Sequence, residues 1–88
     1  LSQNYPNPFN PMTKIEYGIS ESDFVKLIIY DITGREVKTL VNQMEDPGYK
    51  IVEWKGSDNL GNSVGTGMYF YRIKVGDNVQ TKKMIFMK

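Results

Sequence analysis

Hydrophobic and polar side chains alternate along most of the chain after residue 12, with the period of two that is typical of β-strands. Ile15, Tyr17 and Ile19 alternate with two charged residues and a glycine. The same alternation is clearest in residues 68–75 and returns in residues 79–87. No segment shows the 3.6-residue period of an amphipathic helix. The pattern therefore predicts an all-β protein.

Clusters of turn-forming residues separate these apolar runs. They lie at residues 31–34, 47–48, 56–67 and 76–78. Six or seven short strands result, the seventh being a short one inside the glycine-rich loop. The simplest architecture for these strands is an antiparallel β-sandwich of immunoglobulin-like type, and the alternative is a small open barrel. The chain has no cysteine, so we expect Trp54 to fill the centre between the sheets without a disulfide.

The first twelve residues depart from this pattern and are expected to form an extended strap. Three of the four prolines lie here: Pro6, Pro8 and Pro11. Proline lacks a backbone donor and keeps the residue before it out of the helical region. Tyr5 and Phe9 are expected to hold the strap against the domain, since exposed rings would leave apolar area in water. We therefore divide the chain into a boundary strap, residues 1–12, and a sandwich, residues 13–88.

Length and composition exclude several classes of function. With 88 residues the chain fits one domain with a thin core. It contains no histidine and no cysteine, which removes the commonest general base, the thiol nucleophile and the commonest transition-metal ligands. We therefore expect no enzyme, no cofactor and no metal. Its apolar stretches are far shorter than the roughly 20 residues of a membrane-spanning helix. Because residue 1 is Leu, we expect a piece of a longer protein, with any export signal upstream.

The charges are distributed unevenly, although the net charge is only +1. Residues 72–88 hold five basic residues and one acidic residue, whereas residues 1–71 hold six basic and nine acidic residues. A basic edge strand can add to the sheet of a partner through its main-chain groups. Lysines on an edge strand also block unwanted pairing between sheets. Both interpretations fit the residues, and a nucleic-acid partner is not expected because the overall charge is near zero.

Two other groups of residues have a structural and a functional interpretation. In the loop of residues 56–67, Asp58, Asn59 and Asn62 offer oxygen atoms to a cation, but an Asx turn is favoured because Ca²⁺ needs about six or more oxygens. Three aromatic residues could lie exposed and stack on sugar rings: Tyr49, Phe70 and Phe86. Packing in the core is the favoured use of the aromatic side chains, since aromatics dominate small cores.

Several segments spread over the chain carry a family resemblance. They are residues 1–11, Thr13, Ile15 and residues 25–31, 34–37, 54–56, 58–62, 67–72 and 82–88. Together they resemble the type A C-terminal sorting domain of proteins exported by type IX secretion. The middle segments are also similar to the immunoglobulin-like domain of flagellar hook-capping proteins. Lys55 departs from the family pattern, in which an acidic residue follows the tryptophan.

The resemblance implies a non-catalytic signal that directs a larger cargo protein across the outer membrane to the cell surface. It implies a route through the periplasm, an outer-membrane secretion machinery and a surface signal peptidase as partners, and no insertion into the membrane. The expected sorting residues are Lys82, Lys83, Met84, Ile85, Phe86, Met87 and Lys88, and the expected boundary residues are Tyr5, Pro6, Pro8, Phe9 and Pro11.

In this hypothesis the last strand presents its edge, its lysines and the side chains of Met84 and Phe86 to the machinery. Such docking requires a free hydrogen-bonding side on residues 79–88. The alternative function is an accessory immunoglobulin-like module that binds carbohydrate or spaces domains in an extracellular enzyme.

Overall fold

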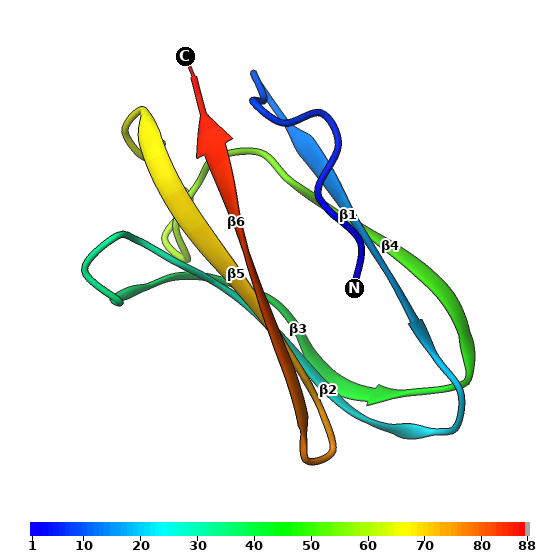
Figure 1. Cartoon of the computed structure of the whole chain (residues 1–88). Coiled ribbons are helices and arrows are strands. Elements are labelled where there is room, and N and C mark those ends of the chain that lie inside the picture. Colours follow the sequence, from blue (N-terminus) through cyan, green and yellow to red (C-terminus); the bar gives the residue numbers. More distant parts are fainter. Residues whose placement is uncertain (88) are drawn as a thin grey trace.

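The computed structural model describes residues 1–87 and contains six strands and no helix within them (Figure 1). The strands are β1 (Thr13–Ile19), β2 (Asp23–Tyr30), β3 (Glu36–Glu45), β4 (Gly48–Trp54), β5 (Gly67–Val75) and β6 (Asn78–Phe86). No helix in the described part of the chain is long and apolar enough to cross a membrane. The predicted seventh strand is absent there, since residues 63–64 contribute only an isolated bridge between Ser57 and Ser63.

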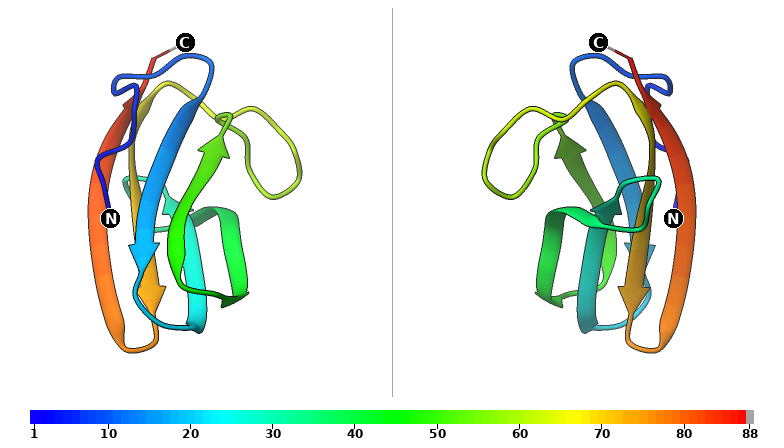
Figure 2. Two further views of the ribbon diagram at one scale, coloured as in Figure 1. Left: turned by 90° about the vertical axis from the view of Figure 1, so that its right-hand side faces the viewer. Right: turned by 90° about the vertical axis from the view of Figure 1, so that its left-hand side faces the viewer.

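The strands form two sheets, and every strand pair is antiparallel. β1 and β4 make a two-stranded sheet, and the other four strands make a sheet of order β3-β2-β5-β6. Figure 2 shows the two layers from the side. β3 crosses into β4 in the other layer, which is how an immunoglobulin-like sandwich joins its sheets. The predicted fold class is confirmed.

Aromatic side chains fill the space between the sheets. Trp54 is buried, as predicted, and its ring centroid lies 5.2 Å from that of Tyr69 and 5.5 Å from that of Phe9. Phe9 stacks on Phe86 with 4.8 Å between centroids. Tyr71 also points inward, as the alternation predicted. Aromatic pairs at these distances contribute beyond their buried area, which suits a chain with so small a core.

One glycine is required by this packing. Gly56 follows Trp54 closely and has φ of 69°, a left-handed conformation that favours glycine. A Cβ atom at this position would lie 2.7 Å from the ring of Phe86. The turn after β4 therefore depends on the absence of a side chain, and it lets the aromatic core approach the backbone.

The strap at the N-terminus runs between the two sheets and closes one side of the sandwich (Figure 1). At its start, Tyr5 exchanges two backbone hydrogen bonds of 2.9 Å with Lys14 of β1. At its end, the Phe9 amide donates to the Ile85 carbonyl over 3.0 Å, and the Met87 amide donates to the Phe9 carbonyl over 3.1 Å. Residues 1–9 therefore join an edge of the small sheet to an edge of the large sheet.

The two rings of the strap have opposite environments. Phe9 is 1% exposed, so the prediction that it holds the strap against the domain is confirmed. Tyr5 is 78% exposed, and the same prediction for Tyr5 is wrong. Because Tyr5 pairs with β1 as a strand residue, neighbouring side chains alternate, and the buried Asn4 occupies the inward position instead. The strap as a domain boundary remains a prediction.

Candidate functional site

The last strand, β6, lies at the edge of the large sheet and pairs within that sheet only with β5. Backbone groups of successive residues point to opposite sides of an antiparallel strand. Because Ile85 and Met87 bond to the strap, the odd-numbered residues of β6 direct their N–H and C=O groups away from β5. These outward groups are the ones that a partner strand would use.

The C-terminal half of this edge is already occupied by the strap. The Ile85 amide donates to Asn7 Oδ1 over 2.9 Å, and Gln3 Nε2 donates to the Lys83 carbonyl over 2.9 Å. With the two bonds to Phe9, four outward backbone groups of residues 83–87 have partners within the chain. A partner strand can add to this half only after the strap leaves.

The N-terminal half of the edge is open. Among residues 1–87, no hydrogen bond reaches the outward backbone groups of Val79 or Thr81. The hairpin turn at Gly76 and Asp77 ends the sheet next to them, and the strap does not extend this far. The predicted free hydrogen-bonding side therefore exists, but it covers residues 79–82 and not the segment that follows.

Two of the expected sorting residues do not face outward. Met84 and Phe86 are 1% and 3% exposed, so the prediction that β6 presents their side chains to a partner is wrong. The reason is the alternation itself: even-numbered residues of β6 lie beside Tyr69 and Gly67 of β5 on the core side of the sheet. The exposed members of the set are Lys83, Ile85 and Met87.

The remaining two members have different positions. Lys82 is half-buried on the core side of β6 at the rim of the sandwich, beside Tyr71 of β5. Lys88 lies outside the described residues. Among the described members, the accessible residues are thus Lys83, Ile85 and Met87 on the outer face of the strand and the half-buried Lys82 on its core side.

A polar network that the sequence analysis did not single out anchors the strap. The buried Tyr71 hydroxyl accepts a hydrogen bond from the Asn4 amide over 2.8 Å and donates one to the Ser2 carbonyl over 2.9 Å. Asn4 Nδ2 donates to Thr13 Oγ1 over 3.0 Å. Burial raises the pKa of Tyr71, and the bond from Asn4 opposes this rise. The available signal was an asparagine directly before the Tyr5-Pro6 pair.

The glycine-rich loop has the structural role that was favoured for it. Asp58 Oδ1 accepts the amides of Leu60 and Asn62 over 3.0 and 2.9 Å, which confirms an Asx turn. Asn59 Oδ1 accepts the Thr39 amide and so covers part of the β3 edge. The loop and the 31–35 turn enclose a pocket of about 410 Å³.

The two aspartates at this pocket, Asp31 and Asp58, accept hydrogen bonds from their own turns. Asp31 accepts the hydroxyl and the amide of Thr33, and Arg35 adds an amide and a guanidinium donor. The bond from the Thr33 hydroxyl is the main cause that lowers the pKa of Asp31 to about 2. Within residues 1–87, no group of three or more acidic residues is arranged to hold a metal ion.

The three aromatic candidates for sugar stacking do not form a row. Phe86 is in the core, which agrees with the favoured interpretation that aromatic side chains pack there. Tyr49 is exposed on the outer face of the small sheet, whereas Phe70 lies half-buried on the outer face of the large sheet. The two accessible rings therefore lie on opposite sides of the sandwich.

A comparison with known protein families identifies the family of this chain. The family model of the secretion system C-terminal sorting domain matches residues 3–87, which includes most of the strap and all six strands. The chain belongs to this family. As a secretion sorting domain, it marks a secreted or cell-surface protein for export by a secretion machinery.

Two solved structures share the fold of this sorting domain. Dimeric latent PorU from Porphyromonas gingivalis aligns with a TM-score of 0.76 and 23% identity, over 97% of this chain and 9% of that one. PorZ, a surface component of the type IX secretion system of the same organism, aligns with a TM-score of 0.69 and 20% identity, over 98% of this chain and 11% of that one. Among curated protein sequences, none matches. The sorting domain thus corresponds to a small part of these much longer chains.

Proposed function

We propose that this domain is a non-catalytic C-terminal export address, which directs a larger cargo protein through type IX secretion to the outside of the cell. The observation that carries the proposal is the family match over residues 3–87. The fold shared with PorZ, a named component of that secretion system, supports the type IX assignment. The cargo would cross the periplasm, engage an outer-membrane machinery and meet a surface signal peptidase that removes the domain.

The recognised feature in this proposal is the end of β6. The sandwich and the strap hold the strand in one conformation, so a receptor meets a pre-ordered surface and loses little conformational entropy on binding. Lys83 and the exposed side chains of Ile85 and Met87 lie on the face turned away from the core. Lys82, beside them at the rim, and Lys88 complete the predicted basic ending. The strap sets the boundary toward the cargo.

The test is export of a reporter that carries a signal peptide and ends with these 88 residues, in a strain that has type IX secretion. A second fusion lacks residues 83–88, and a third carries Lys82→Thr and Lys83→Thr. We expect the complete fusion outside the cell, the truncated fusion retained, and the lysine variant exported less. The measurement is the fraction of reporter outside the cell.

The truncation also removes Met84 and Phe86 from the core, so a matched control is needed. Ile15→Ala damages the core and keeps the terminal sequence. Retention of the truncated fusion together with export of Ile15→Ala separates loss of the address from loss of stability. Equal export of the complete and truncated fusions would contradict the proposal.

A carbohydrate-binding role is not favoured by the arrangement of the described residues. Sugar-binding sandwiches need aromatic rings on one accessible face, and here Tyr49 and Phe70 face opposite ways. The export address therefore remains the function that the residues support best.

A further inference from the structure

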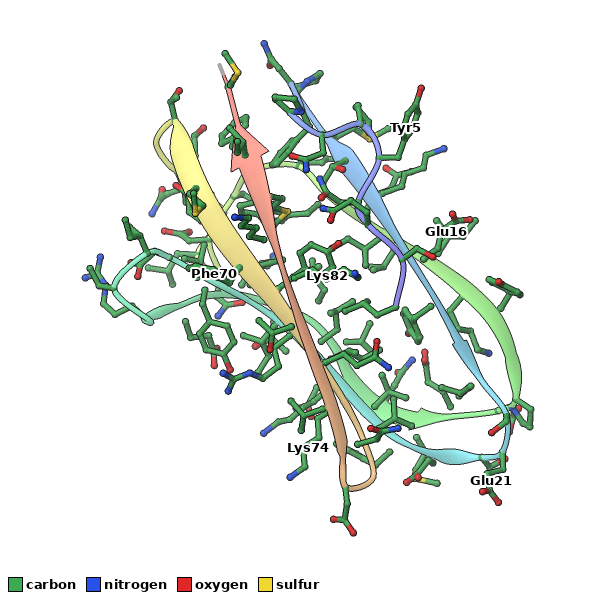
Figure 3. All side chains as sticks on the ribbon, in the orientation of Figure 1. Tyr5, Glu16, Glu21, Phe70, Lys74 and Lys82 are labelled. Carbon is green, nitrogen blue, oxygen red and sulfur yellow. The ribbon has the colours of Figure 1, made fainter. Side chains whose placement is uncertain are left out.

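The outer face of the large sheet combines apolar and basic side chains over β2, β5 and β6. On β2, β5 and β6, side chains that point away from the core alternate with the buried ones. The exposed apolar members are Phe24, Met68, Val79 and Ile85, each between 38% and 49% exposed. Tyr30 and Phe70 lie half-buried between them. Figure 3 shows the labelled Phe70 and Lys74 on one side of the molecule and Glu16 and Tyr5 on the other.

Four cations stand among these apolar side chains, and none of the outward positions on β2, β5 and β6 is acidic. The cations are Lys26, Arg72, Lys74 and Lys83. Lys26 lies directly across from Lys74, and Phe70 lies directly across from Lys83. We call this surface, the outward side chains of β2, β5 and β6, the basic face.

These cations have no acidic partner within the described residues. The ion pair found there joins Arg35 to Asp31, outside the basic face. Arg72 instead lies over the ring of Tyr30, 5.3 Å from its centroid, and its Nε donates to Thr81 Oγ1 over 3.4 Å. These two contacts hold the guanidinium over the outer face of the sheet. An arginine fixed in this way loses little side-chain entropy when it binds a carboxylate.

The small sheet provides a contrast. Its outward side chains include Glu16 and Glu53, and Glu53 lies directly across from Lys14. Two outward glutamates there outnumber Lys14, the outward lysine. The two sides of the sandwich thus differ in sign, and an acidic partner would be attracted to one of them.

We propose that the basic face docks on an acidic protein surface of the secretion machinery, with Arg72 and Lys74 as its central cations and Phe70 as its central apolar contact. This inference rests on the proposed function. Protein interfaces are enriched in aromatic residues, Met and Arg, and they have a polar rim. Tyr and Arg are frequent among the residues that dominate the binding energy of an interface.

The shape of the face fits a protein better than a membrane. Its apolar side chains lie among the cations, and none on β2, β5 or β6 is more than half exposed. Insertion into lipid requires apolar groups that reach about 5–10 Å into the boundary of the bilayer. Flat apposition to another surface needs no such protrusion.

The size of the face indicates a transient complex. Three strands about 4.8 Å apart and eight residues at about 3.4 Å each cover roughly 14 Å by 27 Å. Such an area lies at the small end of specific interfaces, where short-lived encounters are found. A machinery that releases each cargo after export needs a contact of this kind.

The experiment uses the signal-peptide reporter described above. The face variant Arg72→Thr/Lys74→Thr removes two cations and keeps residues that favour strands. The control variant Lys14→Thr/Lys55→Thr removes two exposed lysines away from the basic face. Thermal unfolding of the purified domains verifies that both variants fold. We expect roughly tenfold less export of the face variant, because exposed charges speed association with an oppositely charged surface, and near-normal export of the control.

The outcomes separate this inference from the proposed function. If the fusion lacking residues 83–88 is retained while the face variant is exported as well as its control, the basic face is not the docking surface and the export address still stands. If the truncated fusion is exported normally, the proposed function fails first. Vesicles of anionic phospholipid provide the last arm. Sedimentation of the unmodified domain with them, lost in the face variant, would assign the face to lipid and overturn the protein partner.

Discussion

The two halves of β6 have the same backbone conformation but opposite roles in the fold. Residues 83–86 alternate between exposed and buried side chains, and the strap covers their outer edge. Residues 78–81 are exposed throughout, with no described partner on their outer edge. One half is fastened by Phe9, Asn7 and Gln3, whereas the other depends on its hairpin with β5 alone.

This comparison shows that the last part of β6, which carries the family resemblance, also fastens the strand to the strap and the core. Half of its apolar side chains complete the core, and they are unavailable to a partner while the domain stays folded. A receptor for the folded domain must therefore read the outward side chains, or act after the strap has left. The following predictions test this division, from the largest expected effect to the smallest.

Removing a ring from the anchored half should destabilise the domain far more than trimming the open half. Phe86→Ala leaves a cavity beside Phe9 and Trp54 and should lower the free energy of unfolding by about 3–5 kcal/mol. Val79→Ala, on the exposed half, should change it by less than about 0.5 kcal/mol. Urea unfolding measures both. Similar losses in the two variants would show that the halves do not differ.

The two rings of the strap should behave in the same unequal way. Phe9→Ala should lower the free energy of unfolding by about 3 kcal/mol. This value is near the lower end for a buried ring because release of the strap relieves part of the cavity. Tyr5→Ala should leave the unfolding midpoint almost unchanged because the ring is exposed. Denaturant titration followed by Trp54 fluorescence is the measurement. A larger effect of Tyr5→Ala would reverse the assignment of the anchoring ring.

Tyr71→Phe should weaken the attachment of the strap without creating a cavity in the core. The change leaves the Asn4 amide and the Ser2 carbonyl without their shared partner, at about 1–2 kcal/mol.

The same variant should alter the pH dependence. Since folding raises the pKa of Tyr71, the stability from its neutral hydroxyl is present below the ordinary tyrosine pKa of about 10. That stability is lost as pH rises through the folded value, so Tyr71→Phe should show less loss than the unmodified domain between about pH 9 and 11. Parallel pH curves would exclude this role for Tyr71.

Among the variants expected to destabilise the domain, Asn7→Ala should give the smallest and most local effect. It removes the acceptor of the Ile85 amide and should cost about 1 kcal/mol. Hydrogen exchange of the Ile85 amide should accelerate by about fivefold, while exchange of the Gln80 amide, which points toward β5, should not change. Equal acceleration at both amides would mean that β6 opens as one unit.

Much of this arrangement is readable from local sequence patterns. Alternation placed Ile15, Tyr71 and Trp54 in the core, and turn residues placed the strand ends. The burial of Met84 and Phe86 was also predictable from this alternation. Alignment of residues 82–87 with the inward-facing Tyr69 and Tyr71 of β5 places both side chains in the core. The strap was harder, because proline shows that a segment is extended but not which of its neighbours faces inward.

The sequence by itself determined the all-β class, the strand boundaries to within a few residues, the aromatic core and the family to which the chain belongs. These features depend on local periodicity and turn chemistry, which neighbouring residues encode directly. Only the tertiary structure decided that the strap occupies the end of the β6 edge, that Tyr5 is exposed while Asn4 is buried, and that Lys26, Arg72, Lys74 and Lys83 share one face. Those features join residues up to 80 positions apart, and their pairing is set by strand register and packing, which no single segment specifies.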